Sequence, residues 1–226
     1  MGSSRLSDET LTEFRKLSTP TLSDALDKLS INGAVNGLFL VTHADERVVG
    51  QAFTLLYMPV GIHGGNVGDY IHLVEPGDVV VIDNRGRTDC TVWGDILSAA
   101  AVQGGISGSV IDGVNRDLDE AVVKGYPIFS RGVFMRTGKD RVCLEAVNVA
   151  VVVGGVRVEP GDLVVGDASG VVIIPLAMVA KVLEVAKEIE KQEASILNDL
   201  EAGFSLNVAR EKHGYHQLQR GLGVKS

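Results

Sequence analysis

Several kinds of residue that mark particular classes of protein are scarce in this sequence. It has only two cysteines, 5% aromatic residues and no cluster of Lys and Arg, and its formal net charge is −8. Because proteins that bind nucleic acid need a basic footprint for the phosphates, we expect no nucleic-acid partner. Cys90 and Cys143 have neither disulfide-framework nor metal-site spacing, so we expect reduced thiols and a cytoplasmic protein.

Long apolar runs are missing as well. No stretch approaches the roughly 20 apolar residues of a membrane-spanning helix, and the amino-terminal residues lack the basic-then-apolar pattern of a secretory signal. We therefore expect a soluble protein with no membrane partner. Val, Ala and Gly are abundant and 45% of the residues are hydrophobic, which is typical of a buried α/β core. A chain of 226 residues is expected to form one large domain, 1–226.

The patterns of apolar and turn residues predict the order of helices and strands. A glycine-rich turn, 61–68, and an irregular segment, 83–92, interrupt them. We predict helices at 7–17, capped by Ser7, and at 21–29, strands at 48–60, 79–82, 109–111 and 127–130, and an all-β region at 142–175.

Two acidic turns stand close together in the stretch from Trp93 to Asp117. Gly94-Asp95 precedes an Ala-rich run that predicts a helix from Ile96 to Gln103. Asn115-Arg116-Asp117 precedes a second predicted helix, Leu118 to Lys124, and a short apolar strand lies between the two turns. Both turns are then expected beyond the carboxyl ends of parallel strands, the edge at which open α/β sheets bind their ligands.

Each carboxylate of these turns also has a structural explanation. Asp95 and Asp117 stand at predicted N-cap positions, where a carboxylate accepts backbone N–H groups, and Glu120 completes a pattern that resembles a capping box. Arg116 has no capping role, because a cation is disfavoured at the positive end of a helix dipole. A solvated surface side chain is the alternative, whereas a bound carboxylate or phosphate would account for an arginine there.

These residues carry a resemblance to a known family. Asp95, followed after twenty residues by Arg116-Asp117, matches the D-x20-R-D pattern of the class II 4-hydroxy-4-methyl-2-oxoglutarate/4-carboxy-4-hydroxy-2-oxoadipate aldolases. They belong to the superfamily named after the regulator of ribonuclease E activity A. The chain resembles it over roughly residues 18 to 215, with further similar segments at Pro20–Leu26, Gly154–Val156, Pro160–Asp162 and Gly166–Val171.

The resemblance implies both a fold and a reaction. The fold is α/β: a single αββα swivelling-type domain with a mixed sheet wrapped by helices and a long C-terminal helix. The reaction is cleavage of a 4-hydroxy-2-oxo acid to pyruvate and a second oxo acid by a carbon–carbon lyase that depends on Mg²⁺ or Mn²⁺. No Lys suited to a Schiff base lies in an apolar strand, which also favours a metal as the electrophile.

The resemblance further implies a role for each residue of the motif. Asp117 binds the metal ion, Arg116 stabilises the negative charge that develops on the keto oxygen, and Asp95 orients a water that takes the proton of the 4-hydroxyl group. Backbone N–H groups at the start of the following helix hold the substrate carboxylate. The substrate-binding residues are then Gly94, Asp95, Ile96, Leu97 and Arg116.

Residues 176–226 are expected to form a C-terminal helical extension at a subunit interface. A long amphipathic helix is predicted from Leu176 to Ala202 and a short one from Leu206 to His213. The resemblance implies a homotrimer or homohexamer, in which a glutamate from a neighbour's C-terminal helix completes the site. Glu193 is the best match here for a metal-site residue of that kind, although the arginine that follows it in the family is replaced near Ile196.

Two parts of the expected site stay open. The turn 61–68 is either a flexible connection or a wall over the substrate, with His63 and Asn66 as polar contacts. A second carboxylate of the substrate would be met by Arg136 or Lys139, and position in the sequence does not choose between them.

The resemblance also leaves an alternative function. Some members of the superfamily are non-catalytic regulators that bind a ribonuclease, and in those the Asp after the motif's Arg is typically replaced. Asp117 is present here, which favours the enzyme. Oxaloacetate decarboxylation passes through the same pyruvate enolate, so we expect that activity too, and the sequence separates it poorly from aldol cleavage.

Overall fold

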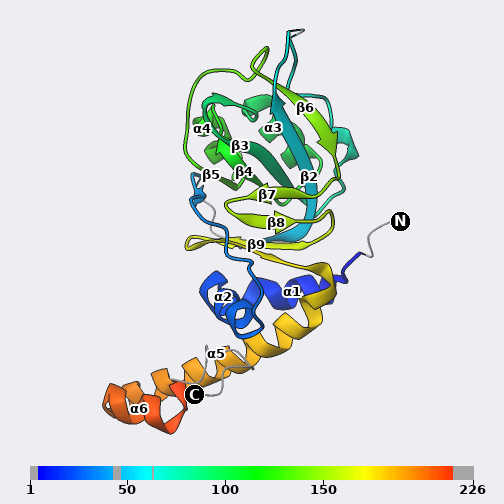
Figure 1. The fold of residues 1–226 in the computed structure, drawn as a ribbon. Helices are drawn as coiled ribbons and strands as arrows, with labels where there is room; N and C mark the ends of the chain where they lie inside the picture. Colours follow the sequence, from blue (N-terminus) through cyan, green and yellow to red (C-terminus); the bar gives the residue numbers. More distant parts are fainter. Residues whose placement is uncertain (1–4, 43–46, 63, 216–226) are drawn as a thin grey trace.

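The computed structural model describes residues 5–42, 47–62 and 64–215, and a mixed sheet forms its centre (Figure 1). The strands follow the order β1-β5-β4-β3-β2-β9-β10, and β6 also pairs with β2. A separate two-stranded hairpin is formed by β7 and β8. The strands are β1 Phe39–Leu40, β2 Val48–Pro59, β3 Val79–Thr91, β4 Gly108–Val114, β5 Ile128–Ser130, β6 Val142–Val147, β7 Val151–Val153, β8 Val156–Val158, β9 Leu163–Asp167 and β10 Gly170–Ile174.

The helices gather at two ends of the molecule. In Figure 1, α3 and α4 lie with β3 and β4 at one end, while α1, α2 and α5 lie beyond β9 at the other. In the described part of the chain, no helix is both long and apolar enough to cross a membrane. The α-helices are α1 Asp8–Lys16, α2 Thr19–Lys28, α3 Asp95–Gln103, α4 Leu118–Val123, α5 Val179–Glu201 and α6 Leu206–Lys212, with short 3₁₀ helices at Ile71–Leu73 and Leu176–Met178.

The centre of the sheet is parallel and buried on both faces. Strands β2, β3, β4 and β5 pair in parallel, whereas β1, β6, β9 and β10 join them antiparallel. Val80 and Ile82 of β3 pack in the same apolar cluster as Ala101 of α3 and Ala121 of α4, and Val81 faces the β7–β8 hairpin on the opposite side. A strand covered on both faces needs a continuous apolar run, as β3 has at its start.

The predicted α/β fold, with its mixed sheet wrapped by helices and its long C-terminal helix, is confirmed. Ser7 caps α1 by accepting a hydrogen bond from the Thr10 amide. The second helix begins two residues earlier than expected, at Thr19, because Ser18 is its N-cap and Pro20 suits the first turn.

The prediction of an irregular segment at 83–92 is wrong, because β3 continues to Thr91. Its pairing with β4 shifts in register twice, first between Asp83 and Arg87 and again between Arg87 and Thr91. Arg85 and Gly86 adopt positive φ angles of 57° and 67° within the first shift. Extra residues in the strand bend it and break the alternation of side chains, so the pattern in the sequence resembles a loop.

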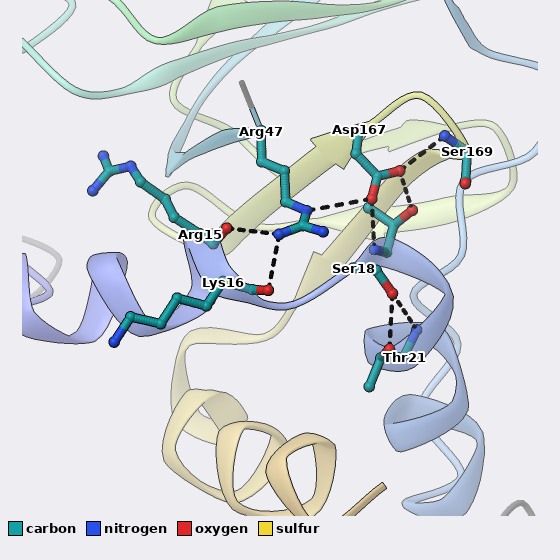
Figure 2. A network of polar contacts seen from close by, with 8 residues as sticks. Arg15, Lys16, Ser18, Thr21, Arg47, Asp167 and Ser169 are labelled. Atoms are coloured by element: carbon teal, nitrogen blue, oxygen red, sulfur yellow. Dashed lines mark hydrogen bonds and ion pairs between the residues drawn. The ribbon is translucent and has the colours of Figure 1, made fainter. Parts of the chain in front are cut away.

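A polar network joins the α1–α2 connection to the turn between β9 and β10 (Figure 2). The Asp167 carboxylate accepts hydrogen bonds from the Thr19 amide at 2.8 Å, the Thr19 hydroxyl at 2.6 Å and the Ser169 amide at 2.9 Å. Arg47 donates to the Arg15 carbonyl at the end of α1, and its Nε lies 3.7 Å from Asp167. Asp167 therefore acts as an N-terminal cap for α2 from a distant part of the sequence.

We expect Asp167→Ala to lower the free energy of unfolding by about 1–3 kcal/mol, because it leaves the Thr19 amide and hydroxyl without their acceptor. Chemical denaturation monitored by circular dichroism measures the change. Asp27→Ala, an exposed carboxylate on α2, is the matched control and should change the value by less than about 0.5 kcal/mol. Equal effects of the two substitutions would contradict the capping role.

Candidate active site

A cavity of about 290 Å³ opens where β3 ends and α3 begins. The loop after β2, the end of β3, the first turn of α3, the turn after β4 and the loop before β6 all contribute to its walls. Its lining residues are Val67, Gly68, Asp69, Thr91, Val92, Trp93, Gly94, Asp95, Ile96, Leu97, Arg116 and Thr137. The five residues that we predicted to bind substrate are among them.

The two acidic turns meet beside this cavity. Asp95 and Arg116 line it, whereas Asp117 is not among its lining residues. The Arg116 amide donates a hydrogen bond to the Trp93 carbonyl at 3.1 Å, which joins the turn after β4 to the turn after β3. Oδ2 of Asp117 lies 3.3 Å from the Asp95 amide and 3.1 Å from Nε of Arg116. The structure thus brings Asp95, Arg116 and Asp117 together, whereas their catalytic roles stay predictions.

The predicted caps are wrong in two respects. Gly94, and not Asp95, is the N-cap residue of α3, so Asp95 is the first helical residue. Asp117 does occupy the N-cap position of α4, but its side chain makes no capping hydrogen bond, and no capping box with Glu120 forms. The cause is the left-handed backbone of Asp117, with φ 56° and ψ 46°, while its carboxylate reaches the Asp95 amide instead.

A left-handed conformation is uncommon for a residue other than glycine, and such strain is often found at functional sites. Gly94 allows the Asp117 carboxylate to lie where it does. A Cβ atom at Gly94 would stand 2.7 Å from Oδ2 of Asp117 and 3.2 Å from Nε of Arg116. Both distances are too short for an ordinary contact. A Cβ atom at this position would therefore displace the ends of both side chains.

Buried side chains support this turn from below. Nε1 of Trp93 donates to the Ser98 hydroxyl at 2.9 Å, and that hydroxyl donates to the Gly94 carbonyl at 3.0 Å. The Trp93 ring stacks on Tyr126 with 5.7 Å between the ring centroids. Sequence reasoning missed this support, because Trp93 and Tyr126 are far apart in the sequence and belong to no motif.

The structure decides part of what the sequence left open about the segment 61–68 and about Arg136 and Lys139. Val67 and Gly68 line it, so the segment 61–68 contributes a wall. Oδ1 of Asn66 accepts a hydrogen bond from the Gly68 amide at 2.8 Å, and His63 lies outside the described residues. Neither Arg136 nor Lys139 is a lining residue, although Thr137 between them is one.

Sequence reasoning also missed three polar lining residues, Asp69, Thr91 and Thr137. Asp69 directly follows the glycine-rich turn, and this position was a signal that could have found it. The two threonines pair as neighbouring backbone segments in an isolated bridge. Their contact links parts of the chain that carry no shared motif, so no sequence signal was available for them.

Glu193 lies on α5, away from the cavity. Burial raises the pKa of its carboxyl, and the nearby Asp24 and Glu190 carboxylates raise it further. Figure 1 shows α5 at the end of the molecule opposite to α3 and α4. Within one chain Glu193 therefore cannot join Asp117, and its metal-site role stays a prediction about an assembly.

The Asp117 carboxylate suits a hydrated cation. Its Oδ2 takes both contacts described above, and its Oδ1 accepts no hydrogen bond from the described residues. Within those residues no group of three or more His, Cys, Asp or Glu side chains could hold a metal ion. Mg²⁺ keeps several of its waters and is commonly bound through one or two carboxylates. The Asp117 carboxylate, which lies next to the cavity-lining residue Arg116, thus fits Mg²⁺ or Mn²⁺ with retained waters.

Comparison with known proteins defines the class. Residues 19–173 match the family described as RraA-like, Aldolase/RraA, and the chain belongs to this family. A protein of Halalkalibacterium halodurans, provisionally named a 4-hydroxy-4-methyl-2-oxoglutarate aldolase, is 37% identical over 183 residues, which cover 79% of this chain and 82% of that protein. Protein DlpA of Legionella pneumophila is 34% identical over 209 residues, 90% of this chain, and the match spans only 34% of its length.

The fold is shared with solved structures. An uncharacterized protein from Pseudomonas syringae has a TM-score of 0.85 and 42% identity, over 92% of this chain and 99% of that one. RraAS2 of Streptomyces coelicolor, described as an unusual member of the RNase ES inhibitor RraA protein family, has a TM-score of 0.76 and 29% identity, over 84% and 96% of the two chains.

We expect Gly94→Ala to displace the Asp117 carboxylate and the Arg116 guanidinium while the chain still folds. The backbone of Gly94, with φ −153°, suits alanine, and the atoms that the new Cβ meets belong to partly exposed side chains that can move, so the free energy of unfolding should change by about 0.5 kcal/mol or less. A crystal structure of the variant together with a denaturation curve measures both effects. Gly61→Ala is the matched control, since an added Cβ meets nothing within 4 Å there. An unmoved Asp117 in the variant would refute the steric argument.

Proposed function

We propose that the protein is a divalent-metal-dependent lyase that cleaves a 4-hydroxy-2-oxo acid to pyruvate and a second oxo acid. The observation that carries this proposal is the contact of Asp117 with both Arg116 and the Asp95 amide at the start of α3, beside a cavity of small-ligand size that Asp95 and Arg116 line. Membership of the family and the name of the Halalkalibacterium relative support the same chemistry.

The start of α3 can bind the carboxylate next to the keto group. The first intrahelical hydrogen bond runs from the Ser98 amide to the Gly94 carbonyl. The amides of Ile96 and Leu97 precede it, so they have no partner within the helix and remain available to an anion. Both residues line the cavity, and the positive end of the helix dipole adds to the attraction.

Arg116 can stabilise the charge that develops during cleavage. When the bond between C3 and C4 breaks, its electron pair moves to C3 and the keto oxygen becomes enolate-like. A guanidinium that is held in position by Asp117 and by the backbone contact with Trp93 can donate hydrogen bonds to that oxygen. The interaction strengthens as charge appears, so it lowers the barrier rather than only improving binding.

Asp95 can accept the proton that cleavage releases. The 4-hydroxyl group must lose its proton as the new carbonyl forms on C4, and C3 must gain a proton to give pyruvate. Asp95 lines the cavity at the first position of α3, where a carboxylate reaches a substrate either directly or through a water. One carboxylate can carry the proton from the hydroxyl to C3, so the reaction needs no other reactant.

Asp117 is the residue of this chain that would hold the metal ion. Mg²⁺ or Mn²⁺, when bound, supplies Lewis-acid polarisation of the keto group. In a homotrimer or homohexamer, Glu193 of the partner subunit would complete the site. The exposed side chains of Leu197, Phe204 and Leu206 near the end of α5 and at α6 support such an assembly, because apolar residues grouped at a surface commonly mark an interface.

Regulation of a ribonuclease is a second candidate function. The observation in its favour is the match to RraAS2, which is described as a member of an RNase inhibitor family. Asp117 favours the enzyme instead, because the regulators that this chain resembles typically have another residue in its place. Oxaloacetate decarboxylation belongs with the enzyme, since loss of CO₂ leaves the same enolate.

We expect Asp117→Asn to weaken Mg²⁺ binding by at least the 10–100-fold that loss of a merely supporting residue causes, and to abolish Mg²⁺-dependent pyruvate release. Asn keeps the shape and tolerates the left-handed backbone, so the fold should survive. Calorimetric titration with Mg²⁺ and a coupled pyruvate assay measure the two effects. Asp119→Asn, an exposed neighbour on α4, is the control. Pyruvate release that persists in the variant or in EDTA would contradict the metal-binding role of Asp117.

We expect Arg116→Lys to lower kcat on the order of 10²–10³, the scale for losing one oxyanion donor, with a much smaller change in KM. Lysine keeps the charge but loses the planar fork. Steady-state kinetics of pyruvate release separate the two constants, and Arg136→Lys, outside the cavity, serves as control. A greatly raised KM with nearly normal kcat would reassign Arg116 to anchoring of the substrate.

A further inference from the structure

A buried amide side chain without partners lies where the register of β3 first shifts. Asn84 follows Asp83 there, and only 1% of its surface is exposed. Neither Oδ1 nor Nδ2 of this residue makes a hydrogen bond in the described part of the chain, and both atoms are sealed from bulk solvent. Buried polar atoms are almost always paired with protein groups or with ordered water, so this amide needs an explanation.

The Asn84 side chain lies against β4. A Cβ atom built on Gly113 would stand 3.1 Å from both Cβ and Nδ2 of Asn84, and 3.3 Å from the Arg87 carbonyl oxygen. Gly113 follows Ile111 on the same face of β4, because side chains alternate along a strand. Ile111 belongs to the apolar cluster that α3 and α4 cover. The Asn84 amide is therefore on the face of the sheet beneath these two helices.

A second unpaired amide lies further along the same face. Asn115 is fully buried, and its Oδ1 accepts a hydrogen bond from the Ser130 hydroxyl at 2.9 Å, while its Nδ2 has no partner among the described residues. That hydroxyl also donates to the Gly132 carbonyl at 3.0 Å, so two acceptors share its single proton. Reversing the Asn115 amide would let Nδ2 donate to Ser130, but would leave Oδ1 unpaired. In either orientation one atom of this amide lacks a partner.

The two amides are close enough to share water. Gly113 and Asn115 are two residues apart on one extended segment, a rise of roughly 6.6 Å, and the Asn84 amide lies over Gly113. A water with hydrogen bonds of about 2.9 Å to two groups spans up to roughly 5.8 Å between them, and a pair of waters spans more. One or two waters can therefore connect Asn84 to Asn115.

The surrounding groups favour a small neutral ligand. Amide and hydroxyl groups donate and accept hydrogen bonds but carry no charge that would hold an ion. The buried carboxylates of the same strands, Asp83 and Asp112, face the opposite side of the sheet. There they accept hydrogen bonds from the Val152 amide at 3.3 Å and the Gly154 amide at 2.8 Å, in the β7–β8 hairpin and its turn. Water has the size and the donors and acceptors that the unpaired amides require.

We infer that one or two water molecules are bound between Asn84 and Asn115, and that they fix the turn from which Arg116 projects. Asn115 directly precedes Arg116, and its backbone is joined on one side to the segment after β5. The waters hold its side chain from within the sheet face. Both amides are enclosed by a single chain, so a neighbouring subunit has no access to them. The water site is independent of the proposed function, whereas its effect on catalysis rests on that function.

A crystal structure of the unchanged protein, at a resolution that shows ordered water, tests the inference directly. A water should lie about 2.7–3.2 Å from Nδ2 or Oδ1 of Asn84, and should reach the Asn115 amide directly or through a second water. Density without water at this place overturns the inference. An Asn84 amide that pairs only with protein groups overturns it as well.

Substitutions of Asn84 separate polarity from shape. Asn84→Leu displaces the waters and leaves Asn115 unpaired, so it should raise the equilibrium constant of unfolding by roughly 5- to 150-fold. Asn84→Ser keeps a donor and an acceptor and leaves room for a further water, so it should raise the constant much less. Without bound water, Asn84→Leu would instead remove two unpaired polar atoms and stabilise the protein, and that result would overturn the inference. Asn36→Leu, at an exposed amide, is the control and should change the constant by about twofold or less.

A double-mutant cycle shows whether the two amides share their water. The combined effect of Asn84→Ala and Asn115→Ala on the equilibrium constant of unfolding should differ from the product of the single effects by more than about twofold, because groups in one hydrogen-bond network are coupled. Independent effects would overturn the shared site. If an alanine variant does not fold, Asn84→Ser and Asn115→Ser provide the same cycle.

Two further measurements connect the waters to the site. In Asn84→Leu, hydrogen exchange of the Arg116 amide should become faster relative to that of the Ile173 amide in β10, since only the turn loses its support. In the same variant kcat for pyruvate release should fall with a much smaller change in KM, and Asn84→Ser should retain most of kcat. Unaltered exchange at Arg116 together with a normal kcat would overturn the positioning role. Faster exchange at Arg116, in a protein that releases no pyruvate even unchanged, would refute the lyase but not the inference.

Discussion

The parallel pairing of β3 with β4 positions Asp95, Arg116 and Asp117, the motif residues of the proposed site. Parallel strands bring their carboxyl ends to the same edge of a sheet, and the pairing of Thr91 with Val114 places the two following turns side by side. The hydrogen bond from the Arg116 amide to the Trp93 carbonyl then connects the turns directly. Helices α3 and α4, which start from these turns, cover the face of the sheet beneath them. The site is therefore a consequence of strand register.

The close approach of Gly94 to the Asp117 carboxylate determines where that carboxylate lies. Gly94 leaves room for the Asp117 carboxylate, and the left-handed backbone of Asp117 directs this carboxylate across to α3 instead of into its own helix. A glycine with little room for a Cβ atom and a residue with a left-handed backbone thus lie next to each other. Strain of this kind persists where surrounding structure over-determines it, and the buried stack of Trp93 on Tyr126 provides that support.

Charge gives the cavity its chemical character. Asp69 and Asp95 line the cavity beside Arg116, and Asp117 lies against Arg116, so negative charges outnumber the positive one and the site is suited to a cation. The same core that buries Tyr57 and Tyr70 also sets the position of Asp69. Apolar packing therefore fixes part of the cavity wall, although neither buried tyrosine ring lines the cavity. The motif residues Asp95, Arg116 and Asp117 do not include this contribution of the core to the cavity wall.

The amino-acid sequence by itself determined the class of fold, most of the helices and strands, and the pairing of Asp95 with Arg116-Asp117 as one candidate site. Apolar periodicity and glycine turns are local signals, and a motif spanning a strand and a helix keeps its meaning without coordinates. Tertiary structure alone decided that Asp117 does not cap its helix, that β3 continues past Asp83, and that Asp69, Thr91 and Thr137 join the cavity. These facts depend on contacts between residues distant in sequence, and such contacts leave no local pattern because they arise only when the sheet and the core assemble.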